Sequence, residues 1–162
     1  MQPLKSFQPE PREVFTTCHE EIRLRSRRCL QFVDVTERIE RIVADSGIRY
    51  GIANIQSRHT TAAVLVNENE PLLLQDLKRT LERIAPRKRS YRHDDFTVRT
   101  VNMEPGELAN GHAHCKSLYL RTSETINVCD GLLQLGRWQR IFFLELDRAR
   151  NRTLSVQLMG TL

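Results

Sequence analysis

Apolar and polar residues alternate at residues 19–25 and 30–35 of this chain. Further strands are expected at residues 50–56, 61–66, 112–122, 125–128, 139–147 and 154–158. Side chains two residues apart on a β-strand point to the same face, so such alternation is typical of half-buried strands. Strands outnumber helices and follow one another near the C-terminus. The pattern therefore predicts an α+β domain with a mostly antiparallel sheet.

Only two segments carry a helical pattern. Residues 36–45 have an apolar face, with Thr36 as a cap and Ser46-Gly47 as the end. The second helix is expected to begin at Pro71, because proline suits a first turn, and to end before Pro86. Leucines and an isoleucine three and four residues apart give it one apolar face.

The chain of 162 residues suits one domain over residues 14–162, which can bury a core without disulfides. Residues 1–13 carry three prolines and are expected to form a loose arm. Residues 87–109 form a long polar stretch, and such connections often carry function. No apolar run approaches the ~20 residues of a membrane span. Residues 1–5 lack a signal-peptide core, and the four cysteines show no CxxC spacing, so we expect reduced thiols and a cytoplasmic location.

Histidines are the main candidates for chemistry. His112 and His114 are two residues apart in a predicted strand, so both imidazoles would face one metal ion. His59 and His93 also stand among polar residues. Imidazole with carboxylate is a ligand set for zinc or a similar divalent ion, and it suits magnesium less well.

Each candidate also has a purely structural interpretation. His59 can hydrogen-bond the backbone through its ring. His93 and Asp94 can form a turn in which the Asp94 carboxylate caps a backbone amide. Glu68 follows an apolar strand, where a solvated turn is the usual situation, although a carboxylate there also suits general acid–base work.

The net charge of +5 is spread along the chain and is most simply explained by a solvated surface. Arg58, Lys116 and Arg121 are candidates to hold phosphate oxygens. The aromatic residues do not cluster with arginines, so a nucleic-acid partner is not expected.

Six motifs follow one another along the chain: Ser57-Arg58-His59-Thr60-Thr61-Ala62-Ala63, Asn67-Glu68-Asn69, His93-Asp94, Gly111-His112-Ala113-His114, Val128-Cys129-Asp130-Gly131 and Leu135-Gly136-Arg137-Trp138-Gln139. Together they resemble the YjbQ-like family, also called the secondary thiamine-phosphate synthase family, over roughly residues 19–160.

The resemblance implies a β-sandwich flanked by two helices, a homotrimer, and a polar pocket in which histidines hold a divalent metal. The residues it points to fall into three groups: His59, His93 and His114, with His112 as an auxiliary, for the metal; Glu68 and Asp94 for acid–base catalysis; and Arg58, Thr60 and Lys116 for substrate. Two departures concern the pocket: the segment from His93 to His114 is longer than in many relatives, and Arg137 stands where many carry threonine.

The resemblance implies a metal-dependent enzyme with weak thiamine-phosphate synthase activity, acting on a small phosphorylated molecule. The residues leave two alternatives open. One is a metal-dependent hydrolase or phosphate-type transferase with another substrate, because no Gly-rich phosphate loop is present. The other is a protein that binds a metal or an anion without catalysis.

Overall fold

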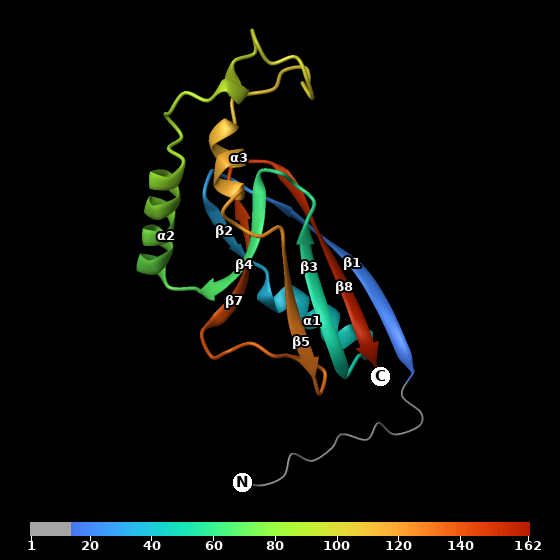
Figure 1. The fold of residues 1–162 in the computed structure, drawn as a ribbon. Coiled ribbons are helices and arrows are strands. Elements are labelled where there is room, and N and C mark those ends of the chain that lie inside the picture. Colours follow the sequence, from blue (N-terminus) through green and yellow to red (C-terminus); the bar gives the residue numbers. More distant parts are fainter. Residues whose placement is uncertain (1–13) are drawn as a thin grey trace, which may run out of the picture.

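The computed structural model describes residues 14–162, so the expected arm at residues 1–13 lies outside the described part. The eight strands form two antiparallel sheets, and the predicted α+β class is confirmed. The first sheet has the order β1 (Phe15–Arg25), β8 (Asn151–Thr161), β3 (Tyr50–Ser57), β5 (Ser123–Cys129) and β6 (Leu132–Leu133). The second has the order β2 (Gln31–Asp34), β7 (Gln139–Glu145) and β4 (Ala62–Glu68). Figure 1 shows both sheets.

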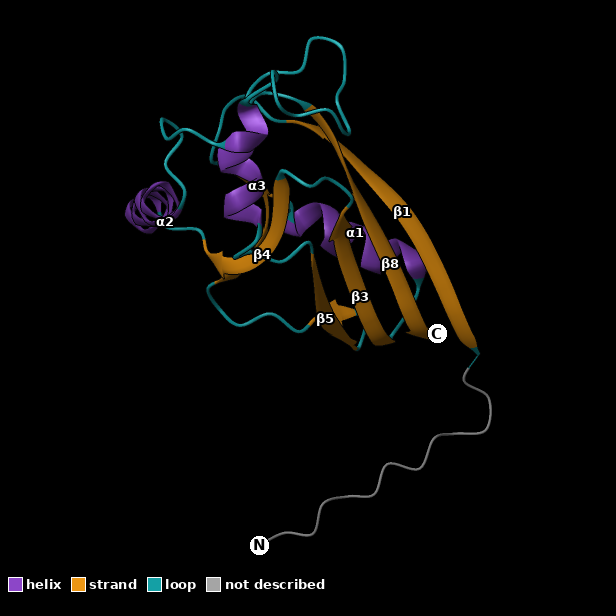
Figure 2. Ribbon diagram, turned by 45° about the horizontal axis from the view of Figure 1, so that its top comes forward, coloured by secondary structure: helices purple, strands orange, loops and turns teal. Residues whose placement is uncertain are grey.

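The second sheet is buried on both faces, and β7 shows how. Ile141 and Phe143 pack into a core shared with the first sheet and with α1 (Thr36–Ser46). Leu144, from the opposite face, packs into a second core with Leu81 of α2 (Pro71–Ile84). Strands buried on both faces lose the simple alternation, which is why residues 141–144 of β7 are apolar without interruption. The helices thus lie on different sides of this sheet (Figures 1 and 2).

The helix ends largely follow the sequence signals. α1 ends at Gly47, whose φ of 71° is left-handed, as a C-terminal glycine permits. Thr36, however, does not cap α1; its hydroxyl donates to Asp34 Oδ1 and accepts from the Ile141 N–H, which ties the helix to β7. α2 begins with Pro71 in its first turn, as predicted.

The expected strand at 112–122 is wrong, because its first half is a helix, α3 (Gly111–Ser117). His112, Ala113 and Lys116 are buried, a spacing that puts them on one helical face. A helix of seven residues is too short for its period to stand out from strand alternation. The chain therefore has three α-helices within residues 14–162, one more than expected.

The connections between the elements and the cysteines have smaller features of their own. Asp130 and Gly131 have φ of 51° and 76° between β5 and β6, the hairpin-turn geometry that an Asp-Gly pair favours. The polar stretch after α2 contains one short 3-10 helix, η1 (Arg92–Asp94), and is otherwise irregular. All four cysteines are free thiols. Among the described helices none is long and apolar enough to cross a membrane.

Candidate functional site: a basic cavity with three histidines

A polar cavity of about 630 Å³ opens at the end of the molecule where α3 begins. Four segments form its wall: the β3–β4 connection, η1 with the irregular segment after it, the start of α3, and the β7–β8 connection. The predicted residues that line it are Arg58, His59, Thr60, His93 and His114. Asn110, two glutamates and four further arginines also line it.

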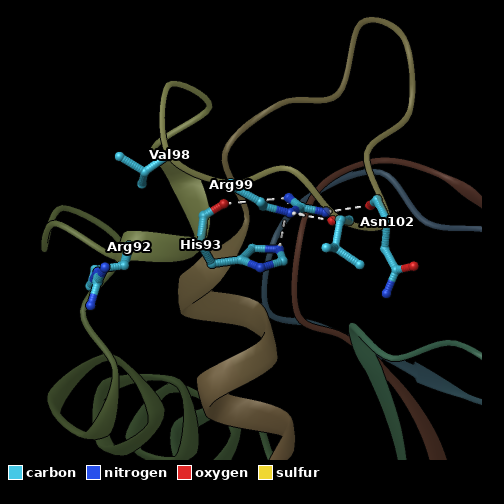
Figure 3. A pocket seen from close by; sticks show the side chains of 6 residues that line it. Arg92, His93, Val98, Arg99 and Asn102 are labelled. Atoms are coloured by element: carbon cyan, nitrogen blue, oxygen red, sulfur yellow. Dashed lines mark hydrogen bonds between the residues drawn. The ribbon is translucent and has the colours of Figure 1, made fainter.

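His93 and His114 form a pair on one wall. Their rings lie edge to face with centroids 4.6 Å apart, because η1 packs against the start of α3. The Nε2 atom of His93 lies 3.1 Å from Asn110 Oδ1 and 3.2 Å from Arg99 Nη1 (Figure 3 shows the Arg99 contact). Burial lowers the pKa of His114, and His93 and Arg99 beside it lower it further. His114 is therefore a neutral imidazole at pH 7.

His59 is held on another wall by the backbone. Its Nε2 accepts a hydrogen bond from the Thr153 N–H at 3.1 Å, so the proton of the neutral ring is on Nδ1. Burial lowers the pKa of His59, and the positive charge of Arg152 lowers it further. The His59 ring thus hydrogen-bonds the backbone, as its structural interpretation expected, and it also borders the cavity.

Arg148 and Arg150 of the β7–β8 connection and Arg152 of β8 line the cavity, and the sequence analysis did not point to them. Arg148 and Arg150 both bond the buried Asp147 carboxylate, at 3.0 and 2.9 Å. Arg152 holds the fully buried Glu145 with two bonds, 2.7 Å from Nε and 2.6 Å from Nη2. Their spacing gives no strand signal, because residues 147–149 form a bend and only Arg152 lies on a strand.

This arrangement leaves one positive charge without a carboxylate of its own at the β7–β8 connection. Asp147 compensates two guanidinium groups with one carboxylate. The Nε atom of Arg150 is buried and has no hydrogen-bond partner among the described residues. A buried donor without a partner is costly, and an anion in the cavity would relieve that cost.

Both predicted catalytic carboxylates lie outside the cavity. Glu68 is exposed at the far end of β4, about 20 Å along the strand from Ala62. Asp94 Oδ1 accepts from the N–H groups of Asn110 and Gly111 at 2.9 and 2.7 Å, so it fixes the start of α3. Neither side chain borders the space in which a ligand would react.

His112 and Lys116 also face away from the cavity. Helical residues two apart point in nearly opposite directions, so His112 does not accompany His114. Lys116 is fully buried, and its Nζ donates to Ala85 O at 2.6 Å and to Glu82 Oε1 at 2.8 Å. His112 Nδ1 lies 3.3 Å from the same Nζ. These two residues join α3 to α2 and do not line the cavity.

The residues do not fit a divalent ion in this conformation. Within residues 14–162 no three His, Cys, Asp or Glu side chains converge as they would around a metal. His93 Nε2 is in contact with Arg99, and His59 Nε2 is bonded to the backbone. A metal ligand must offer a free lone pair, which these two nitrogen atoms lack here.

The fold and the cavity define an α+β sandwich protein with a basic, histidine-containing pocket. The chain belongs to the UPF0047 protein YjbQ-like family, whose model matches residues 20–161. A UPF0047 protein of Methanothermobacter thermautotrophicus is 38% identical over 148 residues, which are 91% of this chain and 94% of that protein. The UPF0047 protein YugU of Bacillus subtilis is 32% identical over 131 residues, covering 80% and 90% of the two chains.

Solved structures show the same fold. A YbjQ-like protein of unknown function from Sulfolobus solfataricus superposes with a TM-score of 0.81 at 31% identity, covering 91% of this chain and 99% of that one. A hypothetical protein from Aeropyrum pernix gives a TM-score of 0.77 at 32% identity, with 88% and 98% covered. Family membership and fold are thus shown.

Proposed function

We propose that the cavity binds a small molecule bearing phosphate and catalyses transfer or hydrolysis at that group. The observation that carries this proposal is the pair Arg148 and Arg150 sharing the single carboxylate of Asp147. Guanidinium groups bond phosphate oxygens with two parallel N–H groups. Because Asp147 holds both side chains, the arginines are in place before a ligand arrives.

The histidines supply the proton-transfer chemistry. His114 has a lowered pKa and is neutral, so its imidazole can accept a proton from an attacking hydroxyl or water. The arginines would stabilise the negative charge that builds up on a leaving phosphate or pyrophosphate. Thiamine-phosphate synthesis also releases pyrophosphate, although the displacement there is at carbon, so the family resemblance supports a site that holds pyrophosphate.

Titration with inorganic pyrophosphate tests the binding part. We expect wild-type protein to bind pyrophosphate by calorimetry and Arg150→Gln to bind it about 10- to 100-fold more weakly, since a hydrogen bond to a charged group contributes about 1.5–3 kcal/mol. Arg79→Gln, an exposed change on α2, is the matched control and should bind like wild type. Equal binding by wild type and Arg150→Gln would remove the proposal.

A metal-dependent transferase or hydrolase is the second candidate. The His93–His114 pair favours it, because two imidazoles this close can share one zinc-like ion once their nitrogen atoms are free. Those two residues are the ones that would hold the ion. Turnover of a phosphate ester that requires zinc or nickel would favour this candidate. Pyrophosphate binding with no turnover under either condition would favour a protein that only binds anions.

A further inference from the structure

The guanidinium of Arg99 lies against the histidine pair. Its Nη1 is 3.2 Å from His93 Nε2, 3.4 Å from His93 O and 2.9 Å from Glu107 Oε1. Figure 3 shows the guanidinium reaching from the irregular segment to the His93 ring. A guanidinium is always protonated and has no acceptor, so its contact assigns a lone pair to His93 Nε2, although Asn110 Oδ1 also lies 3.1 Å from that atom and would favour the other tautomer.

Arg99 also organises residues 95–109, the irregular segment between η1 and α3. Its Nε donates to Val101 O, and its Nη2 donates to Asn102 O. Both Arg99 and its ion-pair partner Glu107 are largely buried, with 12% and 14% of their side chains exposed. The bond to Arg99 lowers the pKa of Glu107, which keeps that carboxylate charged. The segment is therefore built around Arg99, and Arg99 is attached to His93.

A metal ion and Arg99 need the same atom. Zinc binds the lone pair of a neutral imidazole nitrogen at about 2.0–2.1 Å, and that lone pair at His93 Nε2 now receives an N–H from Arg99. The guanidinium also places a full positive charge in contact with the position where a cation would bind. Binding of the ion at Nε2 requires this contact to break.

We propose that Arg99 and a divalent cation compete for His93, so that this chain keeps its histidine pair in an arginine-bound state. Arg99 is then a specificity-determining residue: it lowers the affinity of the cavity for metal ions and leaves anion binding to the other arginines. This inference does not rest on the proposed function, because its readout is metal binding and Arg148 and Arg150 are not involved.

Competition with a metal-binding dye measures the affinity for zinc. We expect Arg99→Gln to bind zinc at least about tenfold more tightly than wild type, the effect of one charge-assisted hydrogen bond. Arg58→Gln is the matched control: it removes the same charge from the same cavity without touching His93, and it should leave zinc affinity within about threefold of wild type. Adding His114→Ala to Arg99→Gln should abolish the gain in zinc affinity.

Hydrogen exchange on the unaltered protein gives a second test, which does not depend on Arg99→Gln folding well. Saturating zinc should speed exchange across residues 99–107, because displaced Arg99 no longer holds Val101 and Asn102. Equal zinc affinity of wild type and Arg99→Gln, an equal gain in Arg58→Gln, or unchanged exchange on zinc binding would each overturn the competition. Loss of pyrophosphate binding in Arg150→Gln would leave the inference untouched.

Discussion

Replacing Glu145 by glutamine should destabilise the protein severely. The Glu145 carboxylate is fully buried and accepts from Ser26 Oγ, Arg152 Nε, Arg152 Nη2 and the Asp147 N–H, all within 3.0 Å. Glutamine offers one oxygen in place of two and turns an amide N–H toward the Arg152 donors. The variant would thus leave a buried guanidinium without its counter-ion, since the Arg152 side chain is only 5% exposed.

The expected loss is about 3 kcal/mol, the lower end of the ~3–5 kcal/mol range for breaking a buried pair, because glutamine keeps one acceptor. For a chain of this size that corresponds to a fall in Tm of roughly 6–12 °C. Arg152 also donates to Thr61 Oγ1, and both residues line the cavity. The same change should therefore weaken pyrophosphate binding in the folded fraction.

The free energy of unfolding is measured by urea denaturation, monitored by fluorescence and circular dichroism. Asp76→Asn is the control, because it breaks an ion pair whose side chains are 67% and 72% exposed and should cost less than about 0.5 kcal/mol. If Glu145→Gln costs no more than Asp76→Asn, the buried pair is not what stabilises the base of the cavity.

Three further expectations follow from the same geometry. Gly111→Ala should cost about 1–3 kcal/mol in urea unfolding, because its Cβ would lie 2.6 Å from Tyr91 Cβ; an unchanged midpoint would show that η1 shifts freely. Burial lowers the pKa of His59, His112 and His114, so the unfolded chain binds more protons below the ordinary histidine pKa of about 6.5. The contribution of these histidines to stability should be fully present above that pH and be lost as the pH drops toward the lowered values. A urea midpoint that increases as the pH is lowered from 7.5 to 5.5 would contradict this. The homotrimer expected from the family should give three times the chain mass in light scattering, and a monomer mass at all concentrations would exclude it.

The strands were predictable because burial on one face leaves a period of two in the sequence. The error at 112–122 arose where that pattern is ambiguous: Gly111, His112 and Ala113 form a short helix whose start is fixed by Asp94. Nothing near residue 111 signals this, because the carboxylate comes from 17 residues earlier in the chain. Contacts at such separations are decided by packing and not by local propensity.

For the site, the family motifs located Arg58, His59, Thr60, His93 and His114 at the cavity, but the arginines after β7 were overlooked. In the sequence, Arg148 and Arg150 look like surface charges. Their role depends on Asp147 being buried, which no local pattern shows. Glu68 differs from them, because it stands in a motif, yet β4 carries it away from the cavity.

The position of β8 between β1 and β3 has a consequence for protein engineering. Arg152 stands on a strand paired on both sides, so one wall of the cavity cannot be altered without disturbing the sheet. The opposite wall comes from residues 95–109, which belong to no sheet and pack through one arginine. Exchanging that segment for loops of other lengths should therefore create new ligand preferences on an unchanged scaffold.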